Sequence, residues 1–463
     1  MTSHSTSSRR AGARLALLLI LSVALSANGS AQNPQGVTLS EAIAIALENN
    51  HDLRLARLDL ISSDARVDEA FGNALPTVDL NARYTLNIQR PVFFFPGEDG
   101  IVRPIEIGSR NALAADITVQ QIIFNSAVLT GVGTAETYAK VSRQQLRMRT
   151  AEVIAGVKRA YYSALFAREV QSVNETLLAN AEANYQNTKL LFEAGVRAEF
   201  DAIRAEVAVA NQRPRVIEAR NAYESALDNL RLLLGYEGGD PVALEPVGDL
   251  ADPSAIGSEP SFVEAATTMR AYNSTLESLR LIAEVNKGLI DVHRSEYLPT
   301  VAFFGSYKYE GQADNLGDLD FQPSAFAGLN LSLNLYNGGK TEAKVAQARV
   351  AYDKSRFDIA RVDAGLTTQL EEALRRIDYA RERIAAGERT IGQAERAYSI
   401  ATTTYKAGTG TQLQINDADL ALAQARLNRL NAVFDYNLAR VQLEFLLGKH
   451  VLLEGDEVMY RAE

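Results

Sequence analysis

The sequence predicts a mainly α-helical chain that also carries transmembrane β-strands. Three observations predict this class: four segments of period-two alternation, two very long helical segments, and an internal duplication. Alternation over about ten residues is typical of a β-strand with one apolar and one polar face, and about ten tilted residues cross a bilayer. A half-buried sheet of a soluble protein is the alternative interpretation of the same strands.

The clearest strand is predicted over residues 76–89, within the segment LPTVDLNARYTLNIQ of residues 75–89. After Pro76, apolar and polar side chains alternate there without a fault. The other strands are predicted over 113–124, 299–310 and 325–336, and the segment 113–124 alternates least regularly. Each half of the chain therefore supplies two strands.

Four strands cannot form a membrane structure on their own. An open sheet edge in lipid leaves unpaired backbone groups with no water to bond them. Four strands spaced about 4.8 Å apart and tilted near 40° would close a cylinder roughly 8 Å across, too narrow for the side chains. Three chains would supply about twelve strands and a cylinder of roughly 24 Å, which leaves a lumen. Geometry therefore predicts a barrel shared by several copies.

Residues 1–31 are predicted to be a secretory signal peptide. Arg9, Arg10 and Arg14 precede the apolar run Leu15–Ala24, and small residues stand before Gln32. The apolar run is too short for a membrane helix.

The remaining composition excludes several classes of protein. Cysteine is absent, so a disulfide framework and a cysteine metal site are excluded. The net charge of −10 becomes more negative when the three arginines of the signal peptide are removed, which argues against a nucleic-acid partner. No clustered catalytic constellation is visible, so an enzyme is not expected, and neither a cofactor nor a metal site is predicted.

The chain contains an internal duplication. A shift of 223 residues aligns Asn50 with Asn273 and Leu75–Val78 with Leu298–Val301, and later a shift of 213 aligns Gly235 with Gly448. The ten-residue difference falls in the loop near 90–110. This predicts a first repeat over 32–236, a linker over 237–260, a second repeat over 261–448 and a tail over 449–463.

Each repeat is predicted to contain one long helix and a shorter return helix. The long helices are expected at about 125–192 and 339–405, each roughly 100 Å long, and the return helices at about 198–235 and 411–447. Further helices over Leu53–Phe71 and Leu276–Arg294 are expected to stack end to end with the return helices. Many alanines permit close packing of such helices.

These features together resemble the TolC family of bacterial outer-membrane efflux proteins. The resemblance rests on the duplicated unit, on Leu-Pro-Thr before the first strand of each half, and on Phe124-Asn125 and Tyr336–Lys340 at the strand-to-helix junctions. It covers nearly all of the mature chain. It implies a homotrimer with a 12-stranded outer-membrane barrel in lipid, continued by a long periplasmic α-helical barrel. The linker and tail would form an equatorial belt.

The resemblance also implies a function. Family members are passive exit channels of tripartite efflux pumps or type I secretion systems, and they work with a periplasmic adaptor and an inner-membrane transporter. A non-conducting tether that spans the periplasm is the structural alternative for this chain.

Two short turns would be the periplasmic tips that meet the adaptor. Their central residues are Gly195 and Val196 in the first half and Gly408 and Thr409 in the second. A glycine in this place also ends a helix in a left-handed conformation.

A gate is implied just inside the tips. Asp201 and Asp417 match acidic positions of the family, and Tyr405 matches a tyrosine that bonds the position of Asp201 in the closed state. Gly410 stands where the family has a gate arginine, although Arg197 occupies the equivalent place in the first tip. Arg204 aligns with Asp417 in the repeat register, so one layer of the gate is expected to alternate in charge. Solvated helix faces with ordinary salt bridges are the alternative.

The loop over 90–112 contains Phe93, Phe94 and Phe95. These side chains are expected to pack within the loop or to anchor at the membrane interface. Contact with a receptor or a substrate is the other interpretation.

Overall fold

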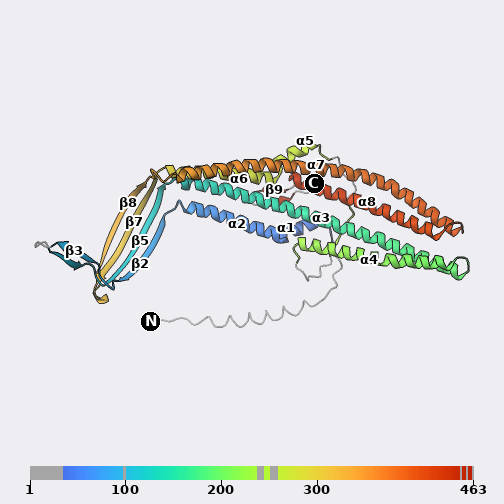
Figure 1. The fold of residues 1–463 in the computed structure, drawn as a ribbon, viewed down its shortest axis with the longest axis horizontal. Helices are drawn as coiled ribbons and strands as arrows, with labels where there is room; N and C mark the ends of the chain where they lie inside the picture. Colours follow the sequence, from blue (N-terminus) through green and yellow to red (C-terminus); the bar gives the residue numbers. More distant parts are fainter. Residues whose placement is uncertain are drawn as a thin grey trace, which may run out of the picture.

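The computed structural model describes residues 35–96, 101–236, 244–250, 259–448, 451–454 and 457–460. The predicted signal peptide lies outside the described residues, as do most of the predicted linker and part of the tail. The described chain is elongated, with a four-stranded sheet near one end and two helical tips at the other (Figure 1). Long helices connect the sheet to the tips.

The sheet is antiparallel, and its strand order is β2–β5–β7–β8. Its members are β2 (Thr77–Leu86), β5 (Asn111–Phe124), β7 (Thr300–Ala313) and β8 (Phe321–Ser332). The register places Leu80, Ile117 and Tyr307 side by side on one face. Asp79, Thr118 and Ser306 lie side by side on the other face.

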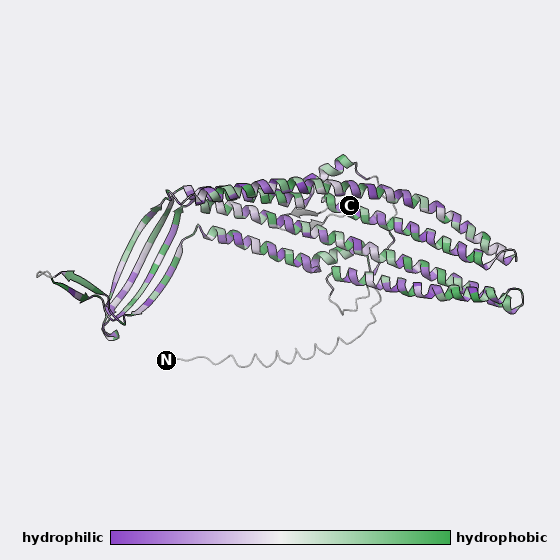
Figure 2. Ribbon diagram, in the orientation of Figure 1, coloured by the Kyte–Doolittle hydropathy of each residue, from purple (hydrophilic) through white to green (hydrophobic). Residues whose placement is uncertain are grey.

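The helices lie beyond one end of the sheet and cover neither of its faces (Figures 1 and 2). Leu80 and Tyr307 on the apolar face are accordingly exposed. The interpretation as a half-buried sheet of a soluble protein is therefore wrong. The polar face carries one aromatic pair, Phe304 and Phe326, whose ring centroids are 6.2 Å apart.

The last strand ends earlier than the sequence predicts. Its predicted range was 325–336, but β8 begins at Phe321 and ends at Ser332, so Leu333 and Leu335 lie outside it. The partner strand sets this limit, because Ser332 pairs with Thr300 at the beginning of β7, directly after Pro299. Proline has no amide hydrogen for a ladder hydrogen bond.

The loop over 90–112 contains strands that the sequence analysis did not predict. It contains a separate antiparallel hairpin of β3 (Val92–Pro96) and β4 (Val102–Glu106), which projects beyond the sheet at the far left of Figure 1. All three phenylalanines of β3 are exposed. They therefore do not pack within the loop, whereas anchoring at the membrane interface, the other half of the expectation, stays a prediction.

The helices occur as two equivalent sets. The first set is α1 (Leu39–Asn49), α2 (His51–Gly72), α3 (Ser126–Glu193) and α4 (Glu199–Leu233). The second set is α5 (Phe262–Tyr272), α6 (Ser274–Arg294), α7 (Lys340–Lys406) and α8 (Gln412–Leu447). Across the described residues, none of these helices has a stretch both long and apolar enough to span a bilayer.

The helices lie side by side in a fixed order. Helix α3 packs against α2 and α4 on one side and against α6 and α8 on the other, and α7 packs against α6 and α8 (Figure 1). This order matches the strand order, because α2 leads into β2, β5 into α3, α6 into β7 and β8 into α7. One edge of the molecule is therefore formed by β2, α2 and α4, and the opposite edge by β8 and α7.

Asparagine residues connect the helix breaks to the return helices in both halves. Asn50 caps α2, and its Nδ2 donates to the Leu233 carbonyl at 2.8 Å. Asn273 caps α6, and its Nδ2 donates to the Leu446 carbonyl at 3.0 Å. The sequence alignment of Asn50 with Asn273 therefore corresponds to one structural joint made twice.

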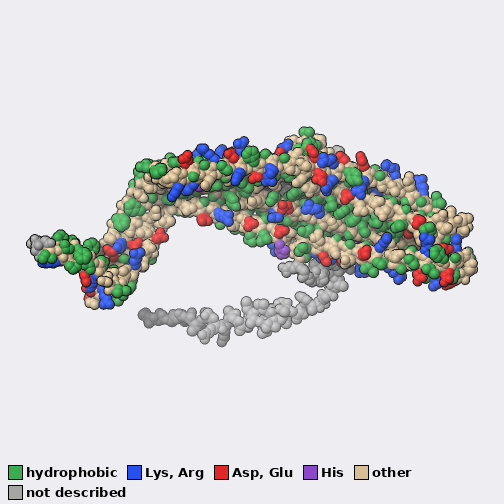
Figure 3. Space-filling model, viewed as in Figure 1, with side chains coloured by type: hydrophobic (Ala, Val, Ile, Leu, Met, Phe, Trp, Pro, Cys, Tyr) green, Lys and Arg blue, Asp and Glu red, His purple; other side chains and the backbone are tan. Residues whose placement is uncertain are grey.

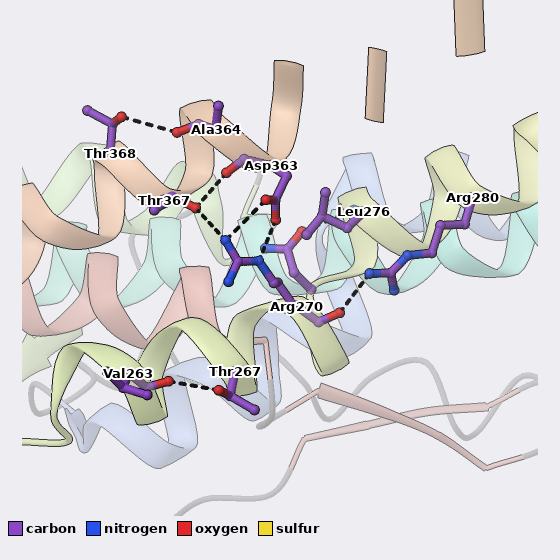
Figure 4. Close-up of polar contacts among 10 residues, drawn as sticks. Val263, Thr267, Arg270, Leu276, Arg280, Asp363, Ala364, Thr367 and Thr368 are labelled. Carbon is purple, nitrogen blue, oxygen red and sulfur yellow. Dashed lines mark hydrogen bonds and ion pairs between the residues drawn. The ribbon is translucent and has the colours of Figure 1, made fainter. Parts of the chain in front are cut away.

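Arginine contacts reinforce the second joint. Arg270 of α5 donates to Asp363 of α7 through Nε and Nη2, at 2.9 and 3.1 Å, and Arg280 of α6 donates to the Arg270 carbonyl (Figure 4). In the first half, Arg57 donates in the same way to the Leu47 carbonyl at 3.0 Å.

The two largest apolar cores lie near these joints. One is formed mainly by α5, α7 and α8, and the other by α1, α3 and the end of α4. The strands β1 (Gln35–Val37) and β6 (Leu244–Pro246) pair in parallel beside the second core. The remaining described strands, β9 (Val451–Glu454) and β10 (Glu457–Tyr460), form a hairpin in the tail.

The junction motifs of the sequence begin the two long helices. The Asn125 side chain caps α3 by accepting from Ala127 N at 2.9 Å. At α7, Gly338 and Gly339 have positive φ, and Thr341 Oγ1 donates to Glu296 Oε2 at 2.8 Å. Both motifs therefore fix the bend from strand to helix.

Candidate functional site at the helical tips

Both predicted tip turns lie at the end of the molecule farthest from the sheet (Figure 1). Gly195 between α3 and α4 has φ 74°, and Gly408 between α7 and α8 has φ 83°. These left-handed conformations let the chain reverse, which favours glycine. Val196 and Thr409 are exposed beside them, so both turns are accessible in the chain.

Tyr405 occupies the centre of the contact between the two helical hairpins. It lies in the last turn of α7, and its side chain is only 2% exposed. Its hydroxyl oxygen lies 3.2 Å from Thr188 Oγ1 of α3, and Thr188 Oγ1 lies 3.4 Å from Gln412 Oε1 of α8. Tyr405 therefore contacts the first hairpin through a buried polar group.

Arg197 in the first tip also contacts Tyr405. Its guanidinium carbon lies 4.5 Å from the centroid of the Tyr405 ring, and its Nη2 donates to the Tyr405 carbonyl at 3.3 Å. A cation over an aromatic ring contributes about 0.5–1 kcal/mol at exposed sites. The first tip is therefore fastened to the second by a charged side chain.

The second tip has no room for an arginine at the corresponding place. A Cβ on Gly410 would lie 2.7 Å from Tyr405 N. The turn would have to shift before any larger residue could fit. Arg197 supplies a guanidinium to this turn from the other hairpin instead.

A line of polar contacts continues from Tyr405 along the seam between α3 and α8. Asn184 Nδ2 donates to Asn416 Oδ1 at 3.3 Å, and Asn180 Nδ2 donates to Asp419 Oδ1 at 3.0 Å. Burial raises the pKa of the Asp419 carboxyl, although the hydrogen bond from Asn180 and the charge of Arg426 act against this. We call Asn180, Asn184, Thr188, Gln412, Asn416 and Asp419 the polar seam.

The sequence analysis did not identify the polar seam. A usable signal exists, because Asn180, Asn184 and Thr188 are spaced by four residues and therefore share one helix face. Gln412 and Asn416 show the same spacing in α8. Polar residues repeating on one face of a helix whose partner is unknown do not reveal which helix they face.

The structure does not bring together three of the predicted gate residues. Asp201 and Arg204 lie on α4, whereas Asp417 is exposed on α8, and α3 packs between these two helices. Within the described part of the chain, these three side chains make no hydrogen bond or ion pair. Among the described residues of one chain, Tyr405 does not bond Asp201, because its hydroxyl faces Thr188. Arg204 and Asp417, which are equivalent in the repeat, are therefore not neighbours within one chain.

No group of three or more His, Asp or Glu side chains in the described residues is arranged to hold a metal ion. A groove of about 560 Å³ lies beside the polar seam and is lined by residues that include Asn184, Tyr398, Tyr405 and Lys406. Amide and hydroxyl groups dominate this lining. The site therefore consists of polar contacts between helices beside a groove.

The comparison with known families identifies the chain. The family model described as "Outer membrane efflux protein" matches residues 42–236 and 267–449, which cover most of both predicted repeats. The chain belongs to the outer membrane efflux protein family. The predicted family, fold class and outer-membrane location are thereby confirmed, whereas closure into a trimeric barrel stays a prediction.

Two curated relatives of this efflux-family chain cover most of its length. Outer membrane protein TolC of Vibrio cholerae is 24% identical over 89% of this chain and 90% of its own. Alkaline protease secretion protein AprF of Pseudomonas aeruginosa is 24% identical over 75% of this chain and 71% of its own. The crystal structure of the Campylobacter jejuni CmeC outer membrane channel superposes with a TM-score of 0.75 at 18% identity, covering 89% and 85% of the two chains. The similarity to CmeC supports the fold.

Proposed function

We propose that three copies of this chain form an outer-membrane exit channel of a tripartite efflux pump or a type I secretion system. The matching order of strands and helices carries this proposal. Both layers leave open edges on the same two sides, so one type of joint closes the sheet into a barrel and the helices into a tube. The polar face of the sheet then lines the lumen, and the apolar face meets lipid.

Apolar side chains on the two edges support the joint. Leu55 and Ile61 are exposed on α2, and Val350 and Phe357 are exposed on α7. Counted from the helix ends next to the sheet, Leu55 and Phe357 each lie about 17 residues away, or about 26 Å. Ile61 and Val350 lie about 11 and 10 residues away. The two edges therefore present exposed apolar side chains at equal distances from the sheet.

The joint can be tested with paired cysteines, because the chain has none of its own. Leu55→Cys combined with Phe357→Cys should give a trimer ladder after oxidation, and each single variant should give none. Monomers alone from the double variant would contradict the ring.

The gate would lie at the tips. In a ring of three, Asp201 and Arg204 on the α4 edge would face α7 of the next copy, so any partners they have would come from the assembly. Asp417 would contribute three carboxylates at one level, enough to bias ion passage. Tyr405, Arg197 and the polar seam would hold the two hairpins of each copy together in the closed state.

Partners would meet the exposed tip turns. A periplasmic adaptor would contact Gly195, Val196, Gly408 and Thr409, and an inner-membrane transporter would supply the energy. The relative named for protease secretion and the family described as efflux proteins support this role in export. We propose no catalytic chemistry for the chain.

Recordings in planar bilayers test conduction. The purified protein should give discrete channels, and Asp201→Ala combined with Tyr405→Phe should raise the single-channel conductance. A barrel that inserts but never conducts, in the native and the variant protein alike, would favour the tether. Channels whose conductance the double variant does not change would contradict the gate assignment alone.

A further inference from the structure

A second groove lies far from both the tips and the sheet. Its lining comes from the middle of the long helices α3 and α7 and from α8, which packs against both of them. Its volume is about 530 Å³. This size falls within the range of about 300–1,000 Å³ that small-molecule sites occupy. The groove is therefore large enough for one small organic molecule.

The groove carries an excess of positive charge. Arg376 pairs with Glu372 at 2.5 Å, and Arg383 pairs with Asp435 at 2.6 Å. Arg159 of α3 is the third arginine of the lining, and its side chain makes no hydrogen bond or ion pair with any described residue. Three guanidinium groups and two carboxylates leave a formal charge of 3 − 2 = +1. The unmatched charge is that of Arg159.

Charged side chains elsewhere on the helices occur beside opposite charges. Figure 3 shows basic and acidic side chains interspersed along the helical part of the molecule. The pairs of Arg429 with Glu388 and of Arg426 with Glu395 are examples. A paired guanidinium has most of its charge compensated, whereas Arg159 is open to an anion that enters the groove.

The other lining residues suit an anion with an apolar body. A guanidinium has five N–H donors, so Arg376 and Arg383 keep donors beyond those in their ion pairs. The guanidinium carbon of Arg383 lies 5.5 Å from the centroid of the Tyr379 ring. Leu438 and the core residue Ala439 add aliphatic surface to the same groove. A ligand with one acidic group and an apolar ring would therefore find partners for both.

The groove faces away from α1 and α5. Val157 and Tyr161 of α3 belong to the core that α1 shares. Arg159 is two residues from each, and two residues turn a helical side chain by about 200°. On α7, Tyr379 is likewise two residues from Ile377, which belongs to the core shared with α5. The groove and the two short helices therefore lie on opposite sides of the helical layer.

This side of the layer would face the lumen in the proposed ring. Each copy contributes α4, α3, α8 and α7 side by side. Twelve helices about 10 Å apart close a tube roughly 38 Å across between helix axes, with an opening of roughly 28 Å. The copies of α1 and α5, each about 10 Å thick, would nearly fill that opening from the inside. They therefore lie outside the tube, and the groove lies on its inner wall.

We propose that this groove is a binding site for exported organic anions, which carry a carboxylate, sulfonate or phosphate group on an apolar body. The inference rests on the proposed exit channel, because it places the site on the path of the cargo. The acidic group contacts Arg159, and the apolar body lies against Tyr379 and Leu438. Three copies supply three such sites at one level of the lumen.

Calorimetric titration of the full-length protein in lipid nanodiscs tests the binding, with naphthalenesulfonate as the probe. Arg159→Ala should weaken binding at least about tenfold, because a contact between two charged groups is lost. Arg159→Lys keeps the charge and should recover part of the affinity. Arg361→Ala is the matched control, since it removes an exposed arginine of α7 about 16 Å nearer the sheet than Glu372. It should bind the probe as the native protein does.

Three results of this titration would overturn the site. The first is equal affinity of the native protein and Arg159→Ala. The second is a naphthyl trimethylammonium cation that binds as tightly as the sulfonate, because the groove would then not select an anion. The third is inorganic sulfate that binds as tightly as naphthalenesulfonate, because the apolar body would then contribute nothing.

Labelling of intact cells tests the place of the groove, because the chain has no cysteine of its own. A maleimide too large for general porins, added outside, should label Gln369→Cys in the groove much faster than Val263→Cys, which is exposed on α5. Equal rates, or faster labelling of Val263→Cys, would overturn the position on the lumen wall. If neither is labelled, the lumen is closed to the outside and the proposed exit channel is rejected, while the titration still decides whether the groove binds anions.

Discussion

Asn50 and Asn273 make the same pair of contacts in the two halves of the chain, whereas the two tips do not resemble each other in their contacts. Arg197 in the first tip contacts Tyr405, but its counterpart Gly410 has no side chain. The outer loops differ as well, because only the first half carries the β3–β4 hairpin. The two halves match where each must hold its own helices together, and they differ at the tips and the outer loops, where the proposed assembly would meet its partners.

The largest effect is expected at the glycines of the shared joint. A Cβ on Gly235 would lie 2.5 Å from the Asn49 carbonyl oxygen, and one on Gly448 would lie 2.8 Å from the Tyr272 carbonyl oxygen. Both glycines have positive φ. Gly235→Ala and Gly448→Ala should each lower the free energy of unfolding by about 2–5 kcal/mol, from backbone strain and a clash with rigid backbone.

Gly195→Ala is the matched control for these glycines. Gly195 also has positive φ, but no atom lies within 4 Å of its added Cβ. Gly195→Ala should lower the free energy of unfolding by only about 1 kcal/mol. Urea unfolding in detergent measures the three variants, and equal losses would show that the close approach to the backbone is unimportant.

A smaller effect is expected at the asparagine joints. Asn50→Ala and Asn273→Ala each remove a helix cap and leave a return-helix carbonyl without its donor. Each should therefore cost about 1–3 kcal/mol. The same unfolding measurement should give similar losses for both variants. A large loss from one and none from the other would break the equivalence of the two halves.

The contacts at the tips should affect gating more than stability. Arg197→Ala removes two contacts to Tyr405, with its ring and with its carbonyl, and Thr188→Val removes one, with its hydroxyl. Each of these contacts is worth about 0.5–1.5 kcal/mol. Each variant should raise the mean conductance or open time in planar bilayers. Lys189→Ala, an exposed neighbour with no such contact, is the control. Arg197→Ala channels indistinguishable from Lys189→Ala channels would refute this role of Arg197.

The smallest effect is expected from Asp419. Its pKa in the folded chain is raised from 3.8, chiefly by burial, so the folded chain holds this proton more tightly than the unfolded chain. The resulting stabilisation is complete below the ordinary aspartate pKa and is lost as the pH rises through the raised pKa.

Asp419→Asn keeps a hydrogen-bonding side chain but cannot titrate. It should flatten the pH dependence of unfolding just above about pH 4, and it should leave Asn180 paired at neutral pH. Unfolding curves collected across this range measure the effect. An unchanged pH dependence would indicate that Asp419 does not titrate in the seam.

Periodicity predicted much of the fold, since the strands around Leu80 and Tyr307 and the two long helices follow from spacing alone. Strand ends were less predictable, because the end of β8 at Ser332 depends on where its partner begins. The hairpin around Phe94 was missed because its two strands are short and apolar on both faces, so they show no alternation. At the tips, the glycines were evident from local chemistry. The contact of Tyr405 with Thr188 joins residues 217 positions apart, which spacing within one segment does not reveal.

In the proposed ring of three, the matching order of strands and helices has a genetic consequence. Each joint pairs one edge of a copy with the opposite edge of the next copy. A subunit damaged on one edge can therefore still join the ring through its intact edge, and it leaves a gap at the damaged edge. In a cell that makes intact and α7-damaged subunits in equal amounts, random mixing would leave about one ring in eight complete. A mutation on a single edge would therefore act dominantly over the wild-type allele.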